Sequence, residues 1–192
     1  MTSRAENGLL PLTAAQRGVF FAQRLDPANP AYNTMVAMEV RGPLDGGLLQ
    51  RAIRRAEGES GSFDVELVER PDGTYQRPVP PGCSTWQEYD FSDEPDPLAA
   101  ARTLIDRDRA TALDLEKDAL SAHILMRVGA DHHVWYQRSH HILSDAFGSV
   151  LHSRRISACY EALATGTEPD GEPLGRLQDL LADESDYRAS AD

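Results

Sequence analysis

Two adjacent histidines and a nearby aspartate have the types and spacing that suit proton transfer. His140 and His141 close a run that contains β-branched and aromatic residues, and Asp145 follows His141 by four residues. Histidine is the side chain that most readily exchanges a proton near neutral pH. The run over 132–141 predicts a strand, and a helical pattern begins at about Ser149. The three side chains are therefore predicted where a strand gives way to a turn and a helix, a common position for chemistry.

A strand sends alternate side chains to opposite faces, so only one of the two histidines can look into a given cleft. One predicted face carries Trp135, Gln137, Ser139 and His141, and the other carries Val134, Tyr136, Arg138 and His140. We expect His141 to face a cleft as a general base, and His140 to be buried or hydrogen-bonded in the sheet. Simpler roles stay open: His140 as a structural histidine, Asp145 as a helix N-cap, and Arg138 as a surface charge or ion-pair partner.

Other reactive groups have weaker patterns. Ser139 and Ser144 lack the Gly-x-Ser-x-Gly context of a nucleophile, and there is no Gly-rich phosphate loop, so the nucleophile is expected to come from the substrate. Five histidines fall within 123–141, but two adjacent strand positions cannot chelate one ion, and we predict no metal site. Cys83 and Cys159 form no metal or redox motif and are predicted to be inert thiols.

The composition is that of an ordinary globular chain with an acidic balance. The chain has 192 residues, 41% of them hydrophobic and 26% charged, with a formal net charge of -12. This length suits one domain, or one lobe of something larger. The negative charge argues against nucleic acid or an anionic membrane as the main partner. Residues 1–8 carry no apolar leader and no run is long enough to span a membrane, so we expect a cytoplasmic protein.

The remaining patterns predict an α+β fold. Thr13 and Gln16 have the spacing of a capping box, and the helix that they begin is expected to turn Ala15, Val19 and Ala22 toward the core. Helices are predicted over 13–24, 48–57, 96–109, 149–163 and 178–192, and strands over 32–41, 63–69, 74–79, 85–91, 121–128 and 132–141. Without a strict βαβ rhythm, these elements favour a mixed-sheet sandwich covered by helices.

The stretch from His140 to Ala146, His-His-Ile-Leu-Ser-Asp-Ala, resembles the His-His-x-x-x-Asp-Gly motif of condensation domains in nonribosomal peptide synthetases. The resemblance continues elsewhere. The segments 9–16 and 26–33 resemble the first conserved core of that family, and Leu-Asp-Leu at 113–115 resembles its Phe-Asp-Leu element. The sequence over 135–141 looks most like the domains of enterobactin-type synthetases. The match covers nearly the whole chain.

The resemblance implies a chloramphenicol acetyltransferase-like sandwich that forms one lobe of a two-lobe domain. Residues 1–175 would form the N-terminal lobe, and 176–192 an acidic helical tail that leads to a second lobe. Such domains join a donor thioester to an acceptor amine, both carried on the phosphopantetheine of peptidyl carrier proteins, with no cofactor of their own. An adenylation domain would follow downstream. The resemblance assigns the catalytic position to His141.

The same resemblance assigns supporting positions. His140, Asp145 and Ala146 are motif residues with structural roles, Asp145 holding the loop by an ion pair. The sequence adds Arg138, Ser144 and Gly148 as supporting residues of the site.

Three departures from the family pattern qualify these roles. Ala146 stands where the motif has Gly, and Glu57, Glu59, Asp64 and Glu66 stand where basic residues are usual, which leaves the ion-pair partner of Asp145 unassigned. The chain also stops where the first lobe ends, so we predict that the isolated chain is inactive. The alternative is a degenerate, non-catalytic lobe that docks carrier proteins or acts as a scaffold. A third interpretation, an acetyltransferase-like trimer, predicts sites between subunits.

Overall fold

The strands that the structure describes fall into two sheets. The computed structural model describes residues 8–80 and 84–190, so the prediction for Cys83 lies outside the described residues. The larger sheet has the order β2-β7-β6-β5, built from β2 (Asn33–Arg41), β5 (Thr85–Asp90), β6 (Ser121–Gly129) and β7 (His132–His140). The smaller has the order β1-β4-β3, built from β1 (Leu10–Pro11), β3 (Val65–Arg70) and β4 (Gly73–Pro78). Only the β5–β6 pairing is parallel in these described sheets, which makes the larger sheet mixed, as predicted.

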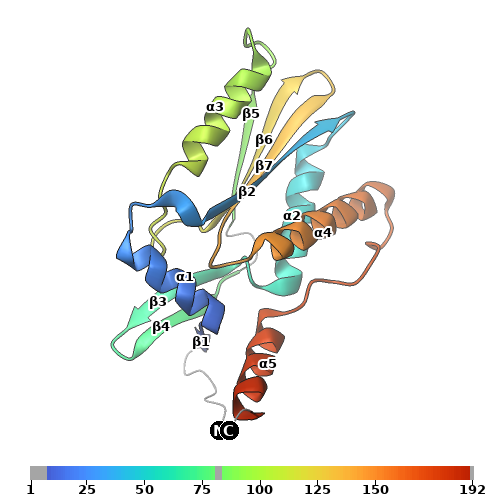
Figure 1. Cartoon of the computed structure of the whole chain (residues 1–192). Coiled ribbons are helices and arrows are strands. Elements are labelled where there is room, and N and C mark those ends of the chain that lie inside the picture. Colours follow the sequence, from blue (N-terminus) through green and yellow to red (C-terminus); the bar gives the residue numbers. More distant parts are fainter. Residues whose placement is uncertain (1–7, 81–83, 191–192) are drawn as a thin grey trace.

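Helices cover both faces of the larger sheet (Figure 1). The helices α2 (Gly46–Ser60) and α4 (Ala146–Thr165) lie on one face, and α3 (Pro97–Arg109) lies on the other. Trp135 packs with buried residues of α2 and α4, whereas Val134 and Tyr136 pack with those of α3. The predicted alternation along β7 is therefore confirmed for these residues, and it sets which side chains of β7 can reach α4.

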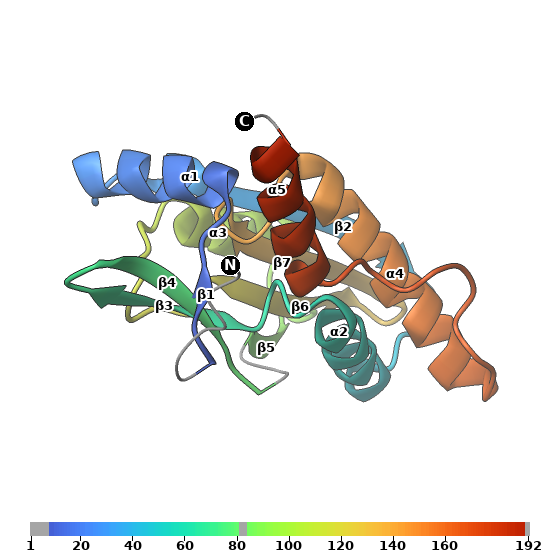
Figure 2. The same ribbon diagram turned by 90° about the horizontal axis from the view of Figure 1, so that it is seen from below.

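The smaller sheet shares a core with the helices α1 (Ala14–Leu25) and α5 (Leu177–Ser190), which lie near one another in Figure 2. Ile142 and Leu143, from the loop after β7, are buried in this core with Phe20 of α1 and Leu177 of α5. Two carboxylate oxygens of Glu184 accept from the backbone N–H of Ala14 at 2.9 and 3.2 Å. The loop that carries the histidine motif is thus held in place by Ile142 and Leu143, which are buried in the core of the smaller sheet.

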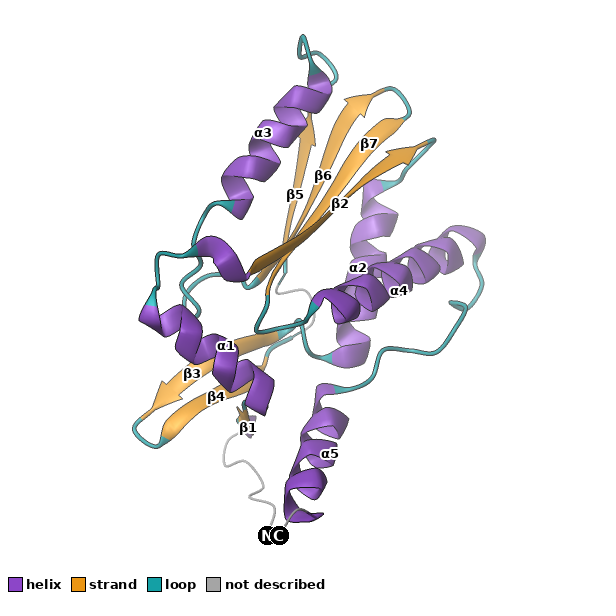
Figure 3. Ribbon diagram, viewed as in Figure 1, coloured by secondary structure: helices purple, strands orange, loops and turns teal. Residues whose placement is uncertain are grey.

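The predicted caps are present, but α2 (Gly46–Ser60) and α4 (Ala146–Thr165) both extend beyond the predicted 48–57 and 149–163. Thr13 and Gln16 form the predicted capping box, and Asp96 caps α3. The predicted start of α4 at Ser149 is wrong, because Asp145 caps the helix and moves its start to Ala146. The predicted strand end is also late by one residue, since β7 stops at His140. Figure 3 shows the short connection between β7 and α4.

The predicted core face of α1 is wrong in part. Ala15 is exposed, and the buried residues of the helix are Phe20 and Gln23. A glutamine reaches the interior because its amide has buried polar partners there, including the ring of His140. The apolar pattern could not predict this, because it assigned every core position to an apolar side chain.

Candidate functional site

His140 joins the end of β7 to α1. Its side chain is 1% exposed, and its Nε2 lies 3.2 Å from Oε1 of Gln23. The backbone N–H of Ile142 donates to Nδ1 at 3.2 Å. Because Nδ1 accepts, the proton of the neutral ring sits on Nε2 and is donated to Gln23. Burial, and then the neighbouring His141 and Arg138, lower the pKa of His140 to about 4. The ring is therefore neutral and fully paired near neutral pH, as a structural histidine should be.

His141 is the first residue after β7 and is half-buried. Its backbone N–H donates to the carbonyl oxygen of Tyr32 at 2.8 Å, which ties the start of the loop to the segment η2 (Pro30–Tyr32) ahead of β2. No hydrogen bond joins its imidazole to a residue that the structure describes. The ring is thus held by its backbone and left available for an external partner, and its catalytic role stays a prediction.

Asp145 organises the loop as an N-cap. Its Oδ1 accepts from the backbone N–H of Gly148 at 2.7 Å, and its carbonyl oxygen accepts from the hydroxyl of Ser144 at 3.1 Å. Within residues 8–80 and 84–190, no cationic side chain forms an ion pair with Asp145, so the ion pair implied by the family resemblance is absent from this part of the chain. The loop is held by capping instead.

The two small residues of the motif region behave differently. Ala146 is already helical, so its methyl group imposes no backbone strain where the family motif has Gly. A methyl group at Gly148, by contrast, would clash with the hydroxyl of Ser144. Gly148 therefore permits the close approach of the loop to the first turn of α4.

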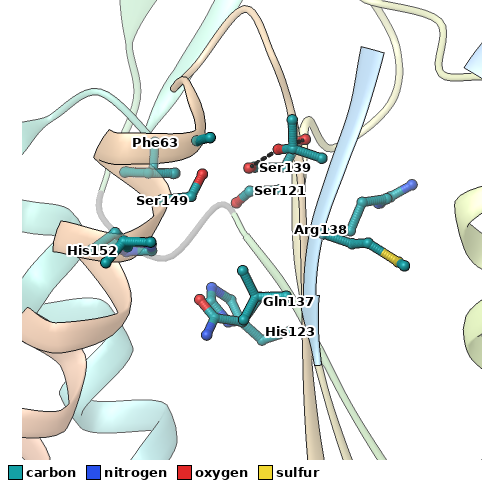
Figure 4. Close-up of a pocket in the computed structure, with 13 residues that line it drawn as sticks. Phe63, Ser121, His123, Gln137, Arg138, Ser139, Ser149 and His152 are labelled. Carbon is teal, nitrogen blue, oxygen red and sulfur yellow. Dashed lines mark hydrogen bonds between the residues drawn. The ribbon is translucent and has the colours of Figure 1, made fainter. Parts of the chain in front are cut away.

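Arg138 is a buried partner of α3 and does not lie on the surface. Its side chain is 8% exposed, and its Nε lies 3.5 Å from Oδ2 of Asp108, which also accepts from the hydroxyl of Tyr136 at 2.7 Å. Figure 4 shows its side chain directed away from His152 and toward the other side of β2. Its charge therefore faces α3.

A cavity of about 230 Å³ lies between α4 and the larger sheet. Ser139, just before the histidine motif, and Ala146, its last residue, both line the cavity, whereas His141 does not. Figure 4 shows His152 and Ser149 on the helix side, with Gln137 and His123 on the sheet side. The cavity is thus next to the motif loop, and its sheet wall includes Gln137 and His123, which lie on the face of the sheet opposite Arg138's charged group.

His123, which lines the cavity, belongs to a buried polar cluster with Glu57 and Ser84 that was not predicted from the sequence. Nε2 of His123 lies 3.2 Å from Oε1 of Glu57, and this same oxygen accepts from the hydroxyl of Ser84. Burial raises the pKa of Glu57, but the hydrogen bond and charge of His123, with Ser84, outweigh it and leave the pKa below its usual range. Glu57 is therefore ionised although it is fully buried.

His152 completes this region. It is 4% exposed, and its ring stacks on Phe63 with 3.9 Å between centroids. Both Glu57 and His152 fall on apolar helix stripes: Glu57 follows Ile53 by four residues, and His152 precedes Ile156 by four. A titratable side chain on an apolar helix stripe is therefore the sequence signal that could have predicted this cluster. A side chain at such a position is buried, and a buried titratable group needs a polar partner.

No group of three or more His, Cys, Asp or Glu residues among 8–80 and 84–190 could hold a metal ion. Among the same residues, no helix is long and apolar enough to cross a membrane. Cys159 is a buried free thiol, and burial raises its pKa.

Comparison with known proteins gives a consistent result. The family model described as "Condensation domain" matches residues 6–192. The chain is 38% identical over 179 residues to a dimodular nonribosomal peptide synthase of Bacillus subtilis, covering 93% of this chain and 8% of that protein. It is 36% identical over 182 residues to an isonitrile lipopeptide synthase of Streptomyces coeruleorubidus, covering 94% of this chain and 12% of that protein.

The fold of this chain also closely resembles those of solved condensation-domain structures. The starter condensation domain of rhizomide synthetase matches with a TM-score of 0.88 at 30% identity, over 95% of this chain and 44% of that one. The first condensation domain of the calcium-dependent antibiotic synthetase matches with a TM-score of 0.83 at 33% identity, again over 95% and 44%. These likenesses confirm the predicted chloramphenicol acetyltransferase-like fold. The chain spans less than half the length of each of these relatives.

Proposed function

The chain belongs to the family of condensation domains, and from this premise we propose that it supplies the N-terminal lobe for amide formation in nonribosomal peptide biosynthesis. Residues 1–175 form the lobe, and 176–192 form the acidic tail that leads toward a second lobe. The match of the family over residues 6–192 is the observation that carries the proposal. The relatives are nonribosomal peptide synthases, which supports a cytoplasmic setting with an adenylation domain in the same protein.

Exposed apolar side chains near the cavity support a second lobe as a partner. Phe147 is 71% exposed and Val150 is 52% exposed on the first turns of α4, and Met35 of β2 is 41% exposed. Val150 and Met35 line the cavity. A cluster of exposed apolar residues beside a cavity is typical of an interaction surface. We assign the second lobe to this surface, where it would close the space over the motif loop.

The proposed reaction needs no nucleophile from the protein. The acceptor amine attacks the carbonyl carbon of the donor thioester, a C–N bond forms, and the C–S bond breaks. The amine loses one proton, and the sulfur of the donor phosphopantetheine leaves as a thiol after it gains one. Both substrates remain on carrier proteins, so phosphopantetheine arrives as part of the substrate and not as a resident cofactor.

His141 is the residue proposed to act on the amine. Its imidazole has no hydrogen-bond partner among the described residues, while the adjacent His140 is fully paired and fixes the strand end. Two roles fit this arrangement: His141 takes the proton of the amine, or it positions the amine and stabilises the tetrahedral intermediate. In either role, removal of the imidazole removes an interaction made in the transition state.

The test is amide formation by the full-length protein that contains this chain, loaded with both carrier-bound substrates. We expect His141→Ala to lower the single-turnover rate by roughly 100-fold or more, the typical contribution of a positioned proton-transfer group. His132→Ala is the matched control, because His132 lies at the far end of β7 and pairs with Glu39. It should leave the rate unchanged.

Equal rates for native protein and His141→Ala would reject the catalytic role and favour the alternative, a non-catalytic lobe that docks carrier proteins. The same assay on the isolated 192-residue chain should give no amide. Amide formation by that chain alone would contradict the proposal that a second lobe completes the site.

A further inference from the structure

The linker between α4 and α5 has no helix or strand of its own. It covers residues 166–176, and Figure 1 shows it running back from the far end of α4 to the start of α5. Its sequence contains three glycines and two prolines, and Gly166 and Gly171 have φ angles of 73° and 76°. A connection of this kind is mobile unless side chains of the packed elements hold its backbone.

Arg155, in the middle of α4, holds this linker by its backbone. The side chain is 8% exposed, and its Nη1 donates to the carbonyl oxygens of Asp170 at 2.9 Å and Gly171 at 3.1 Å. Its Nε and Nη2 donate to the two carboxylate oxygens of Glu59, both at 2.7 Å. A guanidinium has five N–H donors in a rigid plane, so it can bind two groups at once. One side chain therefore joins α4, α2 and the linker.

Glu59, near the end of α2, supplies a further bond to the linker. Its Oε2 accepts from the backbone N–H of Leu174 at 3.3 Å. Burial raises the pKa of Glu59, but the hydrogen bonds from Arg155 and Leu174 outweigh it and leave the pKa below its usual range. Glu59 stands where the family pattern has a basic residue. A basic side chain has donors and no acceptor, so it could not bind this N–H group.

A second ion pair between α2 and the linker provides a contrast. Arg55 pairs with Glu168, but their side chains are 39% and 89% exposed. Exposed pairs stabilise a structure little, because water screens them and two long side chains must be ordered. The Arg155–Glu59 pair is mostly buried, and removing one partner would leave the other charge uncompensated in the interior. The buried pair is therefore the contact that holds the linker.

The linker leads directly into α5. Leu177, the first residue of that helix, is buried in the core of the smaller sheet. The backbone N–H groups of Asp179 and Leu180 then donate to the carbonyl oxygen of Arg176, at the end of the linker. At its other end, α4 begins at the Asp145 cap of the motif loop. One helix thus connects the motif loop, through Arg155, to the start of α5.

We infer that Arg155 is a positioning residue for amide formation, which with Glu59 fixes the linker so that α5 leaves the lobe in one orientation. The inference rests on the proposed function, because the chain beyond α5 is proposed to form the second lobe that closes the site. Arg155 acts through the linker and does not touch the substrate. A shift of about 1 Å between groups that must meet can lower a rate by about 100-fold.

The test uses the full-length protein that contains this chain, with Glu59 and Arg155 both replaced by Met. Apolar side chains in place of a buried ion pair often preserve stability, so the fold is kept while the contacts to the linker are removed. We expect the amides of Asp179 and Leu180 to exchange hydrogen about tenfold faster, from the loss of charge-assisted hydrogen bonds. The single-turnover rate of amide formation should fall about tenfold, with KM for both carrier-bound substrates unchanged.

Arg55→Gln is the matched control, because it breaks the exposed pair to the same linker and should change neither measurement. Arg155→Lys keeps the charge but concentrates its donors on one nitrogen, so both measurements should fall between native and the double variant. It also replaces the double variant if that protein does not fold.

Two results would overturn the inference. One is native exchange at Asp179 and Leu180 in the double variant, which would show that the pair does not hold the start of α5. The other is faster exchange with an unchanged rate of amide formation, which would reject the positioning role. If the native protein formed no amide, the proposed function would fail instead, and hydrogen exchange would still decide whether the pair holds the linker.

Discussion

Two buried histidines show how differently this lobe uses the same side chain. His140, at the seam between β7 and α1, donates to Gln23 and accepts from the backbone of Ile142. His152, under α4, stacks on Phe63 and has no hydrogen bond within the described residues. Burial lowers the pKa of each to about 4, so the difference between them is one of partners and not of charge.

The comparison distinguishes a histidine whose ring is fully hydrogen-bonded, His140, from one whose ring is left unpaired beside a cavity, His152. At the seam, every hydrogen-bonding atom of the ring is used to hold the strand end beside α1, and this fixes the backbone from which His141 projects. At the cavity, the ring is held by stacking and keeps its hydrogen-bonding capacity free. We therefore expect a change at His140 to destabilise the fold, and a change at His152 to leave its stability nearly unchanged.

The largest effect should be on the pH dependence of the free energy of unfolding, to which both histidines contribute. Each has a pKa near 6.5 when unfolded and about 4 when folded, so the unfolded chain binds more protons between these values. The free energy of unfolding should fall as pH drops from 6.5 to 4, by an amount on the order of 3 kcal/mol for each histidine. Urea denaturation at successive pH values measures this.

Replacing either histidine with phenylalanine should remove part of that pH dependence. Glu57, whose pKa is lowered on folding, adds a loss in the same direction as the pH falls below 4.5, the usual pKa of a glutamate. A free energy of unfolding that stays constant from pH 6.5 to 4 would contradict the burial of two neutral rings.

At neutral pH, the two substitutions should differ most in their effect on stability. His140→Phe leaves the side-chain oxygen of Gln23 and the backbone N–H of Ile142 unpaired in the interior, at a cost of about 3 kcal/mol. His152→Phe strands no protein partner and should change the stability by less than about 1 kcal/mol. Chemical denaturation at pH 7.5 measures both, and equal losses would remove the distinction between the paired and the unpaired ring.

A smaller effect is expected at the cap between the two regions. Asp145→Ala should cost about 1 kcal/mol by removing the acceptor for Gly148, whereas Asp145→Asn, which can still cap, should cost only a few tenths. Thermal melting of both variants tests this. Asp96→Ala is the control, because Asp96 caps α3 in the same way on the opposite face of the sheet. A large loss for Asp145→Asn would instead indicate a role for its charge.

Local patterns were enough to predict the framework of the lobe. The hairpin of β6 and β7, the capping box at Thr13 and the cap at Asp96 each depend on residues close together in the chain, and the structure confirms them. The start of α4 was missed by three residues although Asp145 had been considered as a cap, because the apolar helical pattern begins only after the first turn.

Only part of the candidate site could be predicted from the sequence. His140, His141 and Asp145 are adjacent in the chain and were found by their spacing. Glu57, His123 and His152 come from three separate elements, and their cluster exists only once α2, α4 and the larger sheet pack together. The same limit explains Gln23, whose burial depends on a histidine more than a hundred residues later.

The most direct measurement is the NMR spectrum of the histidine ring nitrogens in the 192-residue chain, recorded across pH. We predict that both rings stay neutral down to about pH 5. His140 should keep its proton on Nε2, whereas His152 should exchange between its two tautomers because neither nitrogen has a partner among the described residues. Titration of His140 near pH 6.5, or a single fixed tautomer for His152, would contradict the division between a paired and an unpaired ring.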